Sequence, residues 1–241
     1  MKNITFNCEV VTPMFLGGAE DGSAELRAPT IKGALRFWWR TLHGDWDLDK
    51  LKTEEARLFG GTEELFYING KRQSTGASRS KIQINVIDKG IRINDKKILP
   101  VHKPNPSLNK EQNISSRVMS IDLIKYLAYG TYKFKEGYRD FIDIGSKFSI
   151  EIQHQDNKKH KDFVDISDII KSMKALSSYG GLGSRSRNGF GSFRITDIEG
   201  LEENYLNIFE LKNNTKETKP LFSAFSKNLI WDSNICQYYT K

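Results

Sequence analysis

Strand-like and helix-like hydrophobic patterns alternate along the first 200 residues, and their order limits the folds that the chain can adopt. Residues 4–10 alternate apolar and polar side chains, as a strand with one buried face requires. Residues 30–44 indicate a helix, because a single apolar stripe holds Ile31, Leu35, Trp38 and Leu42. The chain therefore begins with a strand that is followed by a helix.

The later patterns continue this alternation. A short helix is expected at residues 53–61, and a second long helix is expected at residues 165–181. Strand patterns occur at residues 64–68, 81–87, 91–99, 147–153 and 189–198. The elements thus follow the order β, α, β, β and then β, α, β. This order is typical of an α+β fold of the ferredoxin-like (RRM-like) kind.

The domain boundaries follow from the same patterns. We expect one ferredoxin-like domain over residues 1–200. Residues 101–118 interrupt it with two prolines, many amides and almost no apolar side chains, which indicates a loop insertion. Residues 201–241 are polar and weakly patterned, so we interpret them as a C-terminal extension or the start of a further domain.

The first helix carries a row of positive charge. Lys32, Arg36 and Arg40 are spaced four residues apart, where like charges repel by roughly 0.2–0.5 kcal/mol per pair. Because local stability does not explain this row, we infer a partner of opposite charge. The net charge of +7 favours a polyanion such as nucleic acid. Trp39, next to Arg40, would stack a base if it were exposed.

A second candidate site is the glycine-rich stretch at residues 177–193, which holds five glycines and two arginines. It closes a helix and precedes a strand, whereas a P-loop or a dinucleotide fingerprint would open a helix. Glycines leave backbone N–H groups uncovered, and these suit phosphate or ribose. A long turn with solvated arginines is the simpler alternative. The candidate RNA-binding residues here are Gly181, Gly183, Arg185, Arg187, Asn188 and Gly189.

Three motifs in one order carry a resemblance to a known family. The stretch "GGLGSRSRNGFGSF" resembles the glycine-rich loop of the RAMP superfamily, "APTIKGALRFWWR" its KGxLR element, and "RLFGG" its LFG signature. The stretches "TPMFLGGA", "RFWWR" and "YLAYG" are similar, more narrowly, to the Cmr-one family of type III-B CRISPR effector subunits. Together these motifs span residues 12–193.

The resemblance implies a RAMP ferredoxin-like fold with a glycine-rich loop and a second ferredoxin-like unit, for which this chain leaves only a short remainder. It also implies a non-catalytic subunit of an antiviral ribonucleoprotein that contacts the 3′ region of the guide RNA, the target RNA or both, beside other Cmr-type RAMP subunits. In such a fold, Lys32, Arg36 and Arg40 would face the glycine loop and line one cleft with it. No catalytic acidic residue can be assigned.

Two other functions stay open. His43, at the end of the first helix, lies close to where RAMP-fold endonucleases that process guide RNA keep a general acid or base, so the resemblance leaves open a metal-independent endoribonuclease that processes CRISPR RNA. The chain could instead be a pure assembly module whose basic faces meet acidic partner subunits. His102, His154 and His160 lie in polar segments without metal-ligand spacing, and Cys8 and Cys236 have no CxxC partner, so we expect no metal and no cofactor.

The chain contains no apolar run near the roughly 20 residues that a membrane-spanning helix needs. Its first residues lack the pattern of a secretory signal. We therefore expect a cytoplasmic protein without a membrane partner.

Overall fold

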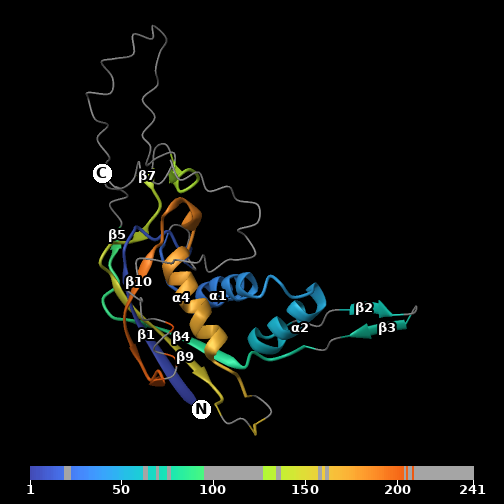
Figure 1. The fold of residues 1–241 in the computed structure, drawn as a ribbon. Helices are drawn as coiled ribbons and strands as arrows, with labels where there is room; N and C mark the ends of the chain where they lie inside the picture. The colour runs from blue at the N-terminus through green and yellow to red at the C-terminus, as the bar shows by residue number, and fades with distance from the viewer. Residues whose placement is uncertain are drawn as a thin grey trace, which may run out of the picture.

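The computed structural model describes residues 1–18, 23–61, 65–68, 71–74, 77–94, 127–133, 137–156, 159–160, 163–203, 205 and 208 of the 241-residue chain. A four-stranded antiparallel sheet forms its centre (Figure 1), with the strand order β10 (Phe193–Glu199), β1 (Lys2–Val10), β9 (Lys147–His154) and β4 (Ile82–Asp88). Two helices, α1 (Ala28–Leu42) and α4 (Ser167–Tyr179), pack against each other on one face of this sheet.

The order of these elements along the chain is β1, α1, β4, β9, α4 and β10, which is the β-α-β-β-α-β order of ferredoxin-like folds. The first and last strands are neighbours in the sheet, and β4 forms an edge. The predicted α+β fold is confirmed.

The core lies between the sheet and the two helices, as the alternating pattern requires. In β1, Phe6 and Val10 face the helices and are buried, whereas Asn7 and Glu9 point to the other face. From α4, Ile169, Met173 and Leu176 are fully buried against the sheet. A second, smaller cluster lies beneath the glycine loop and consists of Phe15, Ala128, Tyr138, Phe141 and Phe190.

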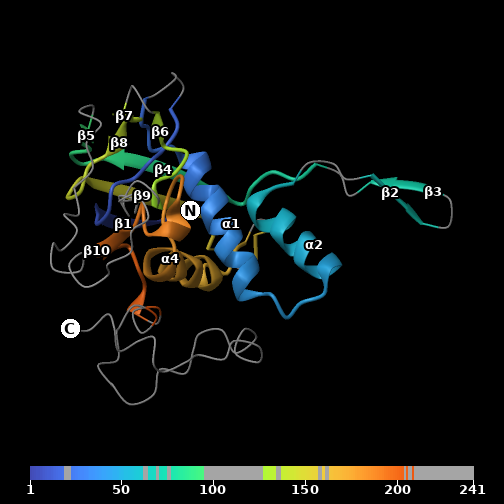
Figure 2. The same ribbon diagram turned by 90° about the horizontal axis from the view of Figure 1, so that it is seen from above.

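Several shorter elements surround this core. The helix α2 (Leu48–Phe59) lies beside α1 and begins five residues before the predicted 53. The strands β2 (Leu65–Ile68) and β3 (Lys71–Ser74) form a hairpin that extends away from the body (Figure 2). Two further pairs join β5 (Ile93–Asn94) to β8 (Phe141–Ile142) and β6 (Tyr132–Lys133) to β7 (Gly137–Tyr138).

The strand predicted at 91–99 is observed only at Ile93–Asn94, because residues 95–100 lie outside the described part. The proposed insertion at 101–118 and most of 201–241 also lie outside it. The domain boundaries therefore stay a prediction. In the described part of the chain, every helix is too short or too polar to cross a membrane.

Candidate functional site

The glycine loop, residues 180–191, joins α4 to β10 and is bonded to the segment that follows β1. The N–H of Ser184 donates to the carbonyl of Phe15 at 2.8 Å, and the N–H of Gly191 donates to the carbonyl of Pro13 at 2.9 Å. Gly183 and Gly191 have φ angles of +90° and +70°, and a Cβ at either position would collide with backbone atoms. These glycines allow the chain to pass close to its neighbours, which fixes the shape of the loop.

The loop's backbone donors are mostly used within the protein. The N–H of Leu182 bonds to Gly191 O at 2.9 Å, that of Asn188 to Arg185 O at 2.8 Å, and that of Gly189 to Ser186 O at 3.3 Å. The expectation that the bare backbone at Gly189 offers a donor to phosphate is therefore wrong. The glycines shape the loop. Its side chains remain to contact a ligand, as do the N–H groups of Gly181 and Gly183, which have no hydrogen-bond partner among the described residues.

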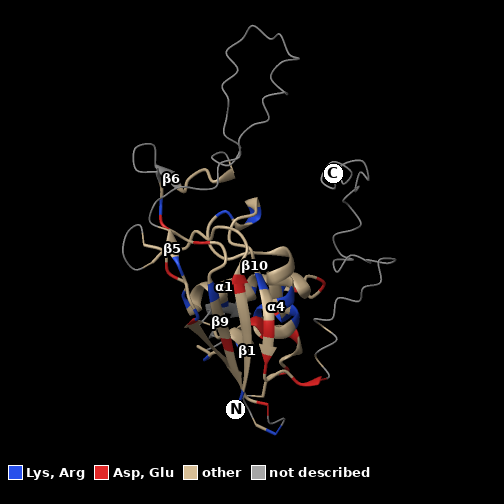
Figure 3. Cartoon of the chain, turned by 90° about the vertical axis from the view of Figure 1, so that its left-hand side faces the viewer, with Lys and Arg blue, Asp and Glu red and all other residues tan. Residues whose placement is uncertain are grey.

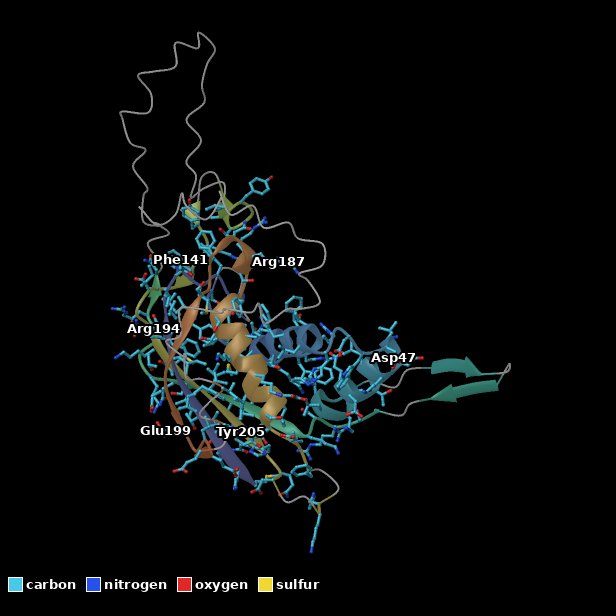
Figure 4. The ribbon with its side chains drawn as sticks, viewed as in Figure 1. Asp47, Phe141, Arg187, Arg194, Glu199 and Tyr205 are labelled. Atoms are coloured by element: carbon cyan, nitrogen blue, oxygen red, sulfur yellow. The ribbon has the colours of Figure 1, made fainter. Side chains whose placement is uncertain are left out.

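The two loop arginines are exposed, and each lies near an aromatic ring. The Cζ atom of Arg185 is 6.0 Å from the ring centroid of Tyr129, which is 75% exposed. Figure 4 labels Arg187 at the loop. Its Cζ atom is 6.0 Å from the ring centroid of Phe37, which is 44% exposed. Neither arginine forms an ion pair with a carboxylate of the described residues. Asn188 is also exposed, and its Nδ2 donates to Leu127 O at 2.8 Å.

An aromatic groove separates this loop from α1. It has a volume of about 340 Å³, and its lining includes Phe37 and Trp38 of α1, Tyr179 at the end of α4, residues 180–183 and Arg187. The ring centroids of Trp38 and Tyr179 lie 6.4 Å apart with a tilt of 38°. This groove joins aromatic faces to a cation, the combination that binds unpaired nucleobases.

The cationic row of α1 does not line the aromatic groove. Arg36 Nε and Arg40 Nη1 each lie 2.7 Å from the same oxygen, Oε1 of Glu55 in α2. The expectation that this row faces the glycine loop is therefore wrong. The reason lies in the tertiary structure, because α2 packs on that flank of α1. Its residue Glu55, only 6% exposed, provides a carboxylate for two of the three cations.

Trp39 is also placed differently from the prediction. It is 3% exposed and packs against Phe59 and Trp46, with ring centroids 6.1 and 5.8 Å away. It therefore does not stack an incoming base. Its neighbour Trp38, which the sequence pattern assigns to the apolar stripe, is half-buried and lines the aromatic groove instead. Ile31 and Leu35 of the predicted stripe are buried as expected, but Trp39 takes the place of Trp38 in the core.

His43 connects the two long helices. Its Nδ1 lies 2.8 Å from Trp39 O, its Nε2 lies 3.2 Å from Oδ2 of Asp168 in α4, and its side chain is 12% exposed. Both ring nitrogens therefore face oxygen atoms of the protein. A role of His43 as general acid or base would require one of these two contacts to open toward a substrate.

A second groove, here called the β4 groove, lies on the α2 side of α1. Its volume is about 630 Å³, and its lining includes Lys32 from α1, Arg79 and Ser80 from the segment before β4, and Ile82 and Ile84 of β4. Burial lowers the pKa of Lys32, and the positive charge of Arg36 lowers it further. Lys32 is thus separated from the glycine loop but lies beside another cation.

The open face of the sheet is poorly suited to RNA, because acidic side chains line it. Figure 3 shows this face with acidic residues along its strands. Asn7 Nδ2 donates to Glu199 Oε1 at 2.8 Å, and Arg194 pairs with Glu9 at 2.9 Å. RRM domains stack bases on aromatic residues of this face. The similarity to RRM domains is therefore one of fold and does not extend to the binding face.

The remaining candidates are the histidines and cysteines outside the two grooves. No group of three or more His, Cys, Asp or Glu side chains suited to a metal occurs among the described residues. His154 was expected in a polar segment, but it is the last residue of β9 and is 5% exposed. Cys8 is buried in the core, and burial raises the pKa of its thiol to about 12. His102 and Cys236 lie outside the described residues.

Curated relatives extend over most of the chain. The Cmr subunit Cmr1-2 of the CRISPR system of Pyrococcus furiosus is 24% identical over 203 residues, which cover 81% of this chain and 96% of the relative. Cmr1-1 of the same organism is 28% identical over 202 residues, 80% of this chain and 49% of the relative. The chain thus spans nearly all of one relative and about half of the other.

Solved structures similar to the chain come from Cmr proteins as well. The chain is similar to apo Cmr1 from Pyrococcus furiosus, with 24% identity, a TM-score of 0.48, and coverage of 86% of this chain and 52% of that one. It is also similar to a chain in the type III-B Cmr-beta complex bound to cognate target RNA, with 13% identity, a TM-score of 0.50, and coverage of 87% and 57%.

The family model described as RAMP superfamily matches residues 7–194, which include both long helices and the whole glycine loop. This match covers well over half of the chain, and it agrees with the β-α-β-β-α-β order and the three sequence motifs. The chain belongs to the RAMP superfamily.

Proposed function

We propose that this protein is a non-catalytic RNA-binding subunit of a type III-B CRISPR ribonucleoprotein that acts in antiviral defence. It contacts the 3′ region of the guide RNA, the target RNA or both, beside other Cmr-type RAMP subunits. The names of its curated relatives support the Cmr assignment. A similar chain from a Cmr-beta complex bound to cognate target RNA supports RNA as the ligand. Such a particle meets its RNA in the cytoplasm.

The observation that carries the proposal is the surface around the glycine loop. Two exposed arginines, Arg185 and Arg187, each lie 6.0 Å from an aromatic ring, and neither has a carboxylate partner among the described residues. Arginine binds phosphate through several N–H donors, and a base can stack on an aromatic ring in any sequence context. A loop whose shape is fixed by its own backbone bonds holds these groups ready without further ordering.

The aromatic groove supplies the stacking faces. Phe37, Trp38 and Tyr179 line it together with Arg187, and its volume of about 340 Å³ suffices for an unpaired base. These residues take the role that the sequence predicted for Trp39. Gly181 and Gly183 line the same groove.

Arg36 and Arg40 remain proposed phosphate contacts on the other flank of α1. Their side chains are 38% and 44% exposed although both bind Glu55, so part of each guanidinium can still reach solvent. Their partner carboxylate removes one of the two charges, and we therefore expect a smaller contribution from them than from Arg185 and Arg187.

Binding of single-stranded RNA to the purified protein tests this proposal. Fluorescence anisotropy over a range of salt concentrations should give an affinity that falls steeply with salt, with a slope near −0.7 per phosphate contact. The double change Arg185→Gln and Arg187→Gln should reduce both the affinity and the slope. The control change Arg194→Gln, at an exposed arginine of β10 that is paired with Glu9, should leave both unchanged.

Two outcomes would favour the other functions. If the protein shows no salt-dependent affinity, or if the double variant binds as the wild type does, the basic surface serves subunit assembly. If purified protein cleaves repeat RNA at one site in EDTA and His43→Ala abolishes the cleavage, the protein is an endoribonuclease.

A further inference from the structure

We propose that the β4 groove is a second binding site for the phosphodiester backbone of RNA, and that it is independent of the glycine loop. The inference rests on the proposed function, because it takes RNA as the ligand. It adds a separate groove, with Lys32 and Arg79, on the flank of α1 that also carries Arg36 and Arg40. Lys32 and Arg79 are the residues that bind phosphate there.

The two grooves are separated by the body of the helix. Successive residues of an α-helix are about 100° apart around its axis, so Lys32 lies about 140° from Phe37 and about 120° from Trp38. The aromatic groove takes Phe37 and Trp38 from α1, whereas the β4 groove takes Lys32. With a helix diameter of about 10 Å between them, a short nucleotide segment in one groove cannot also occupy the other.

The charge of Lys32 lacks compensation from the described protein. Its pKa is lowered by burial first and by the charge of Arg36 second, and no carboxylate opposes these effects. The nearby carboxylate of Glu55 is already bound by Arg36 and Arg40. A partly buried cation beside another cation is unfavourable in the free protein, and a bound anion would remove this disadvantage.

Arg79 contributes a second positive charge to the same groove. It is exposed, it lies between α2 and β4 in the chain, and it forms no ion pair with a carboxylate of the described residues. The first turn of α1 at Ala28 and Pro29 also lines the groove and contains no acidic side chain. The positive end of the helix therefore adds to the potential that Lys32 and Arg79 produce.

The edge of the sheet adds backbone donors. The carbonyl of Lys147, the first residue of β9, accepts from the N–H of Lys89, which follows β4. The carbonyl of the preceding Ser146 instead accepts from the N–H of Val10 in β1. Since alternate residues of a middle strand bond to opposite neighbours, the N–H of Ile84 points away from β9. Because β4 is an edge strand and Ile84 lines the groove, this N–H lies on the open edge of the sheet beside the groove. Backbone donors of this kind are frequent in phosphate contacts.

The number of short RNA molecules bound per protein tests the inference. Isothermal titration with a hexanucleotide of single-stranded RNA should give two equivalents for the wild type. The double variant Lys32→Gln with Arg79→Gln should give one, and Arg185→Gln with Arg187→Gln should also give one. On a longer RNA, each double change should lower the salt slope by about 1.4, from two contacts at about 0.7 each.

A matched control removes the same charge elsewhere. Lys52→Gln with Arg194→Gln changes two exposed residues outside both grooves and should retain two equivalents. Circular dichroism of each variant checks that the fold is kept. One equivalent for the wild type, or two equivalents for Lys32→Gln with Arg79→Gln, would overturn the second site and leave the glycine-loop site in place. Absence of any RNA binding by the wild type would overturn the proposed function as well.

Discussion

Glu55 of α2 holds Arg36 of α1 at 2.7 Å, with its carboxylate buried and only 6% exposed. The same oxygen also contacts Arg40, so one acid joins two turns of α1 to α2. This contact explains how like charges four residues apart are tolerated on one helix.

Removal of this carboxylate should therefore destabilise the protein. We expect Glu55→Gln to lower the free energy of unfolding by about 1–3 kcal/mol, less than for a fully buried pair because both arginines are half-exposed. Urea unfolding measures the change. Glu54→Gln, which removes an acid from the exposed pair with Arg57, is the control and should change the free energy by less than about 1 kcal/mol. Equal effects of the two variants would contradict the role of Glu55.

Substitution of the adjacent residues Trp38 and Trp39 should affect different properties, RNA binding and stability. Trp39→Ala should lower the free energy of unfolding by about 3–5 kcal/mol, because Trp39 is 3% exposed in the core. Trp38→Ala should have a smaller effect on stability but weaken RNA binding by about 1–3 kcal/mol, because Trp38 lines the aromatic groove. Urea unfolding and fluorescence anisotropy separate the two. If Trp38→Ala lowered the stability more and Trp39→Ala weakened RNA binding more, Trp38 would be the core residue, as the sequence pattern predicted.

Two glycines of the loop offer a matched pair. Gly189 and Gly191 have φ angles of +87° and +70°, but only at Gly191 would a Cβ collide with the Leu182 carbonyl. Gly189→Ala should lower the free energy of unfolding by about 1 kcal/mol through backbone strain, and Gly191→Ala should lower it more. Thermal unfolding checks the order. Similar melting temperatures for both variants would mean that the loop adjusts easily.

The stability should also depend on His154 at mildly acidic pH. Burial lowers the pKa of His154 below its usual 6.5, with smaller opposing effects from Asp156 and other charges. The unfolded chain then binds a proton that the folded chain does not, so stability is fully present above pH 6.5 and falls as the pH decreases below it. Urea midpoints between about pH 8 and pH 5 should decrease less in His154→Gln than in the wild type. Parallel pH profiles for both proteins would exclude this residue as the cause.

The sequence predicted the sheet and its two long helices well, because their patterns are local. Alternation in β1, β4 and β9 and the helical stripe of α4 follow directly from which side chains face the core. The short strands β3, β6, β7 and β8 were not predicted. Strands of two to four residues are too short to show a clear alternation, whether the partner strand is adjacent in the chain, as for β3, β6 and β7, or distant, as for β8.

The candidate site was predicted less well, for reasons that a single sequence hides. In the helical pattern, either Trp38 or Trp39 can continue the apolar stripe of α1. Trp39 lies in the core because it packs against Phe59 and Trp46, which the pattern of α1 does not reveal. The cationic row was visible, but its partner Glu55 comes from another helix. Tyr129 and Arg79 belong to no periodic hydrophobic pattern, so the sequence did not indicate them as site residues. Tyr129 does lie within the "YLAYG" motif.

The central claim is that RNA lies against the glycine loop and the aromatic groove. Ultraviolet crosslinking of the assembled ribonucleoprotein, followed by mass spectrometry of the crosslinked peptides, tests it most directly. We predict that crosslinked nucleotides occur on peptides that contain Phe37–Trp38 and residues 179–189, where the exposed rings and arginines lie. Crosslinks confined to the open sheet face, with none on these two peptides, would contradict the account.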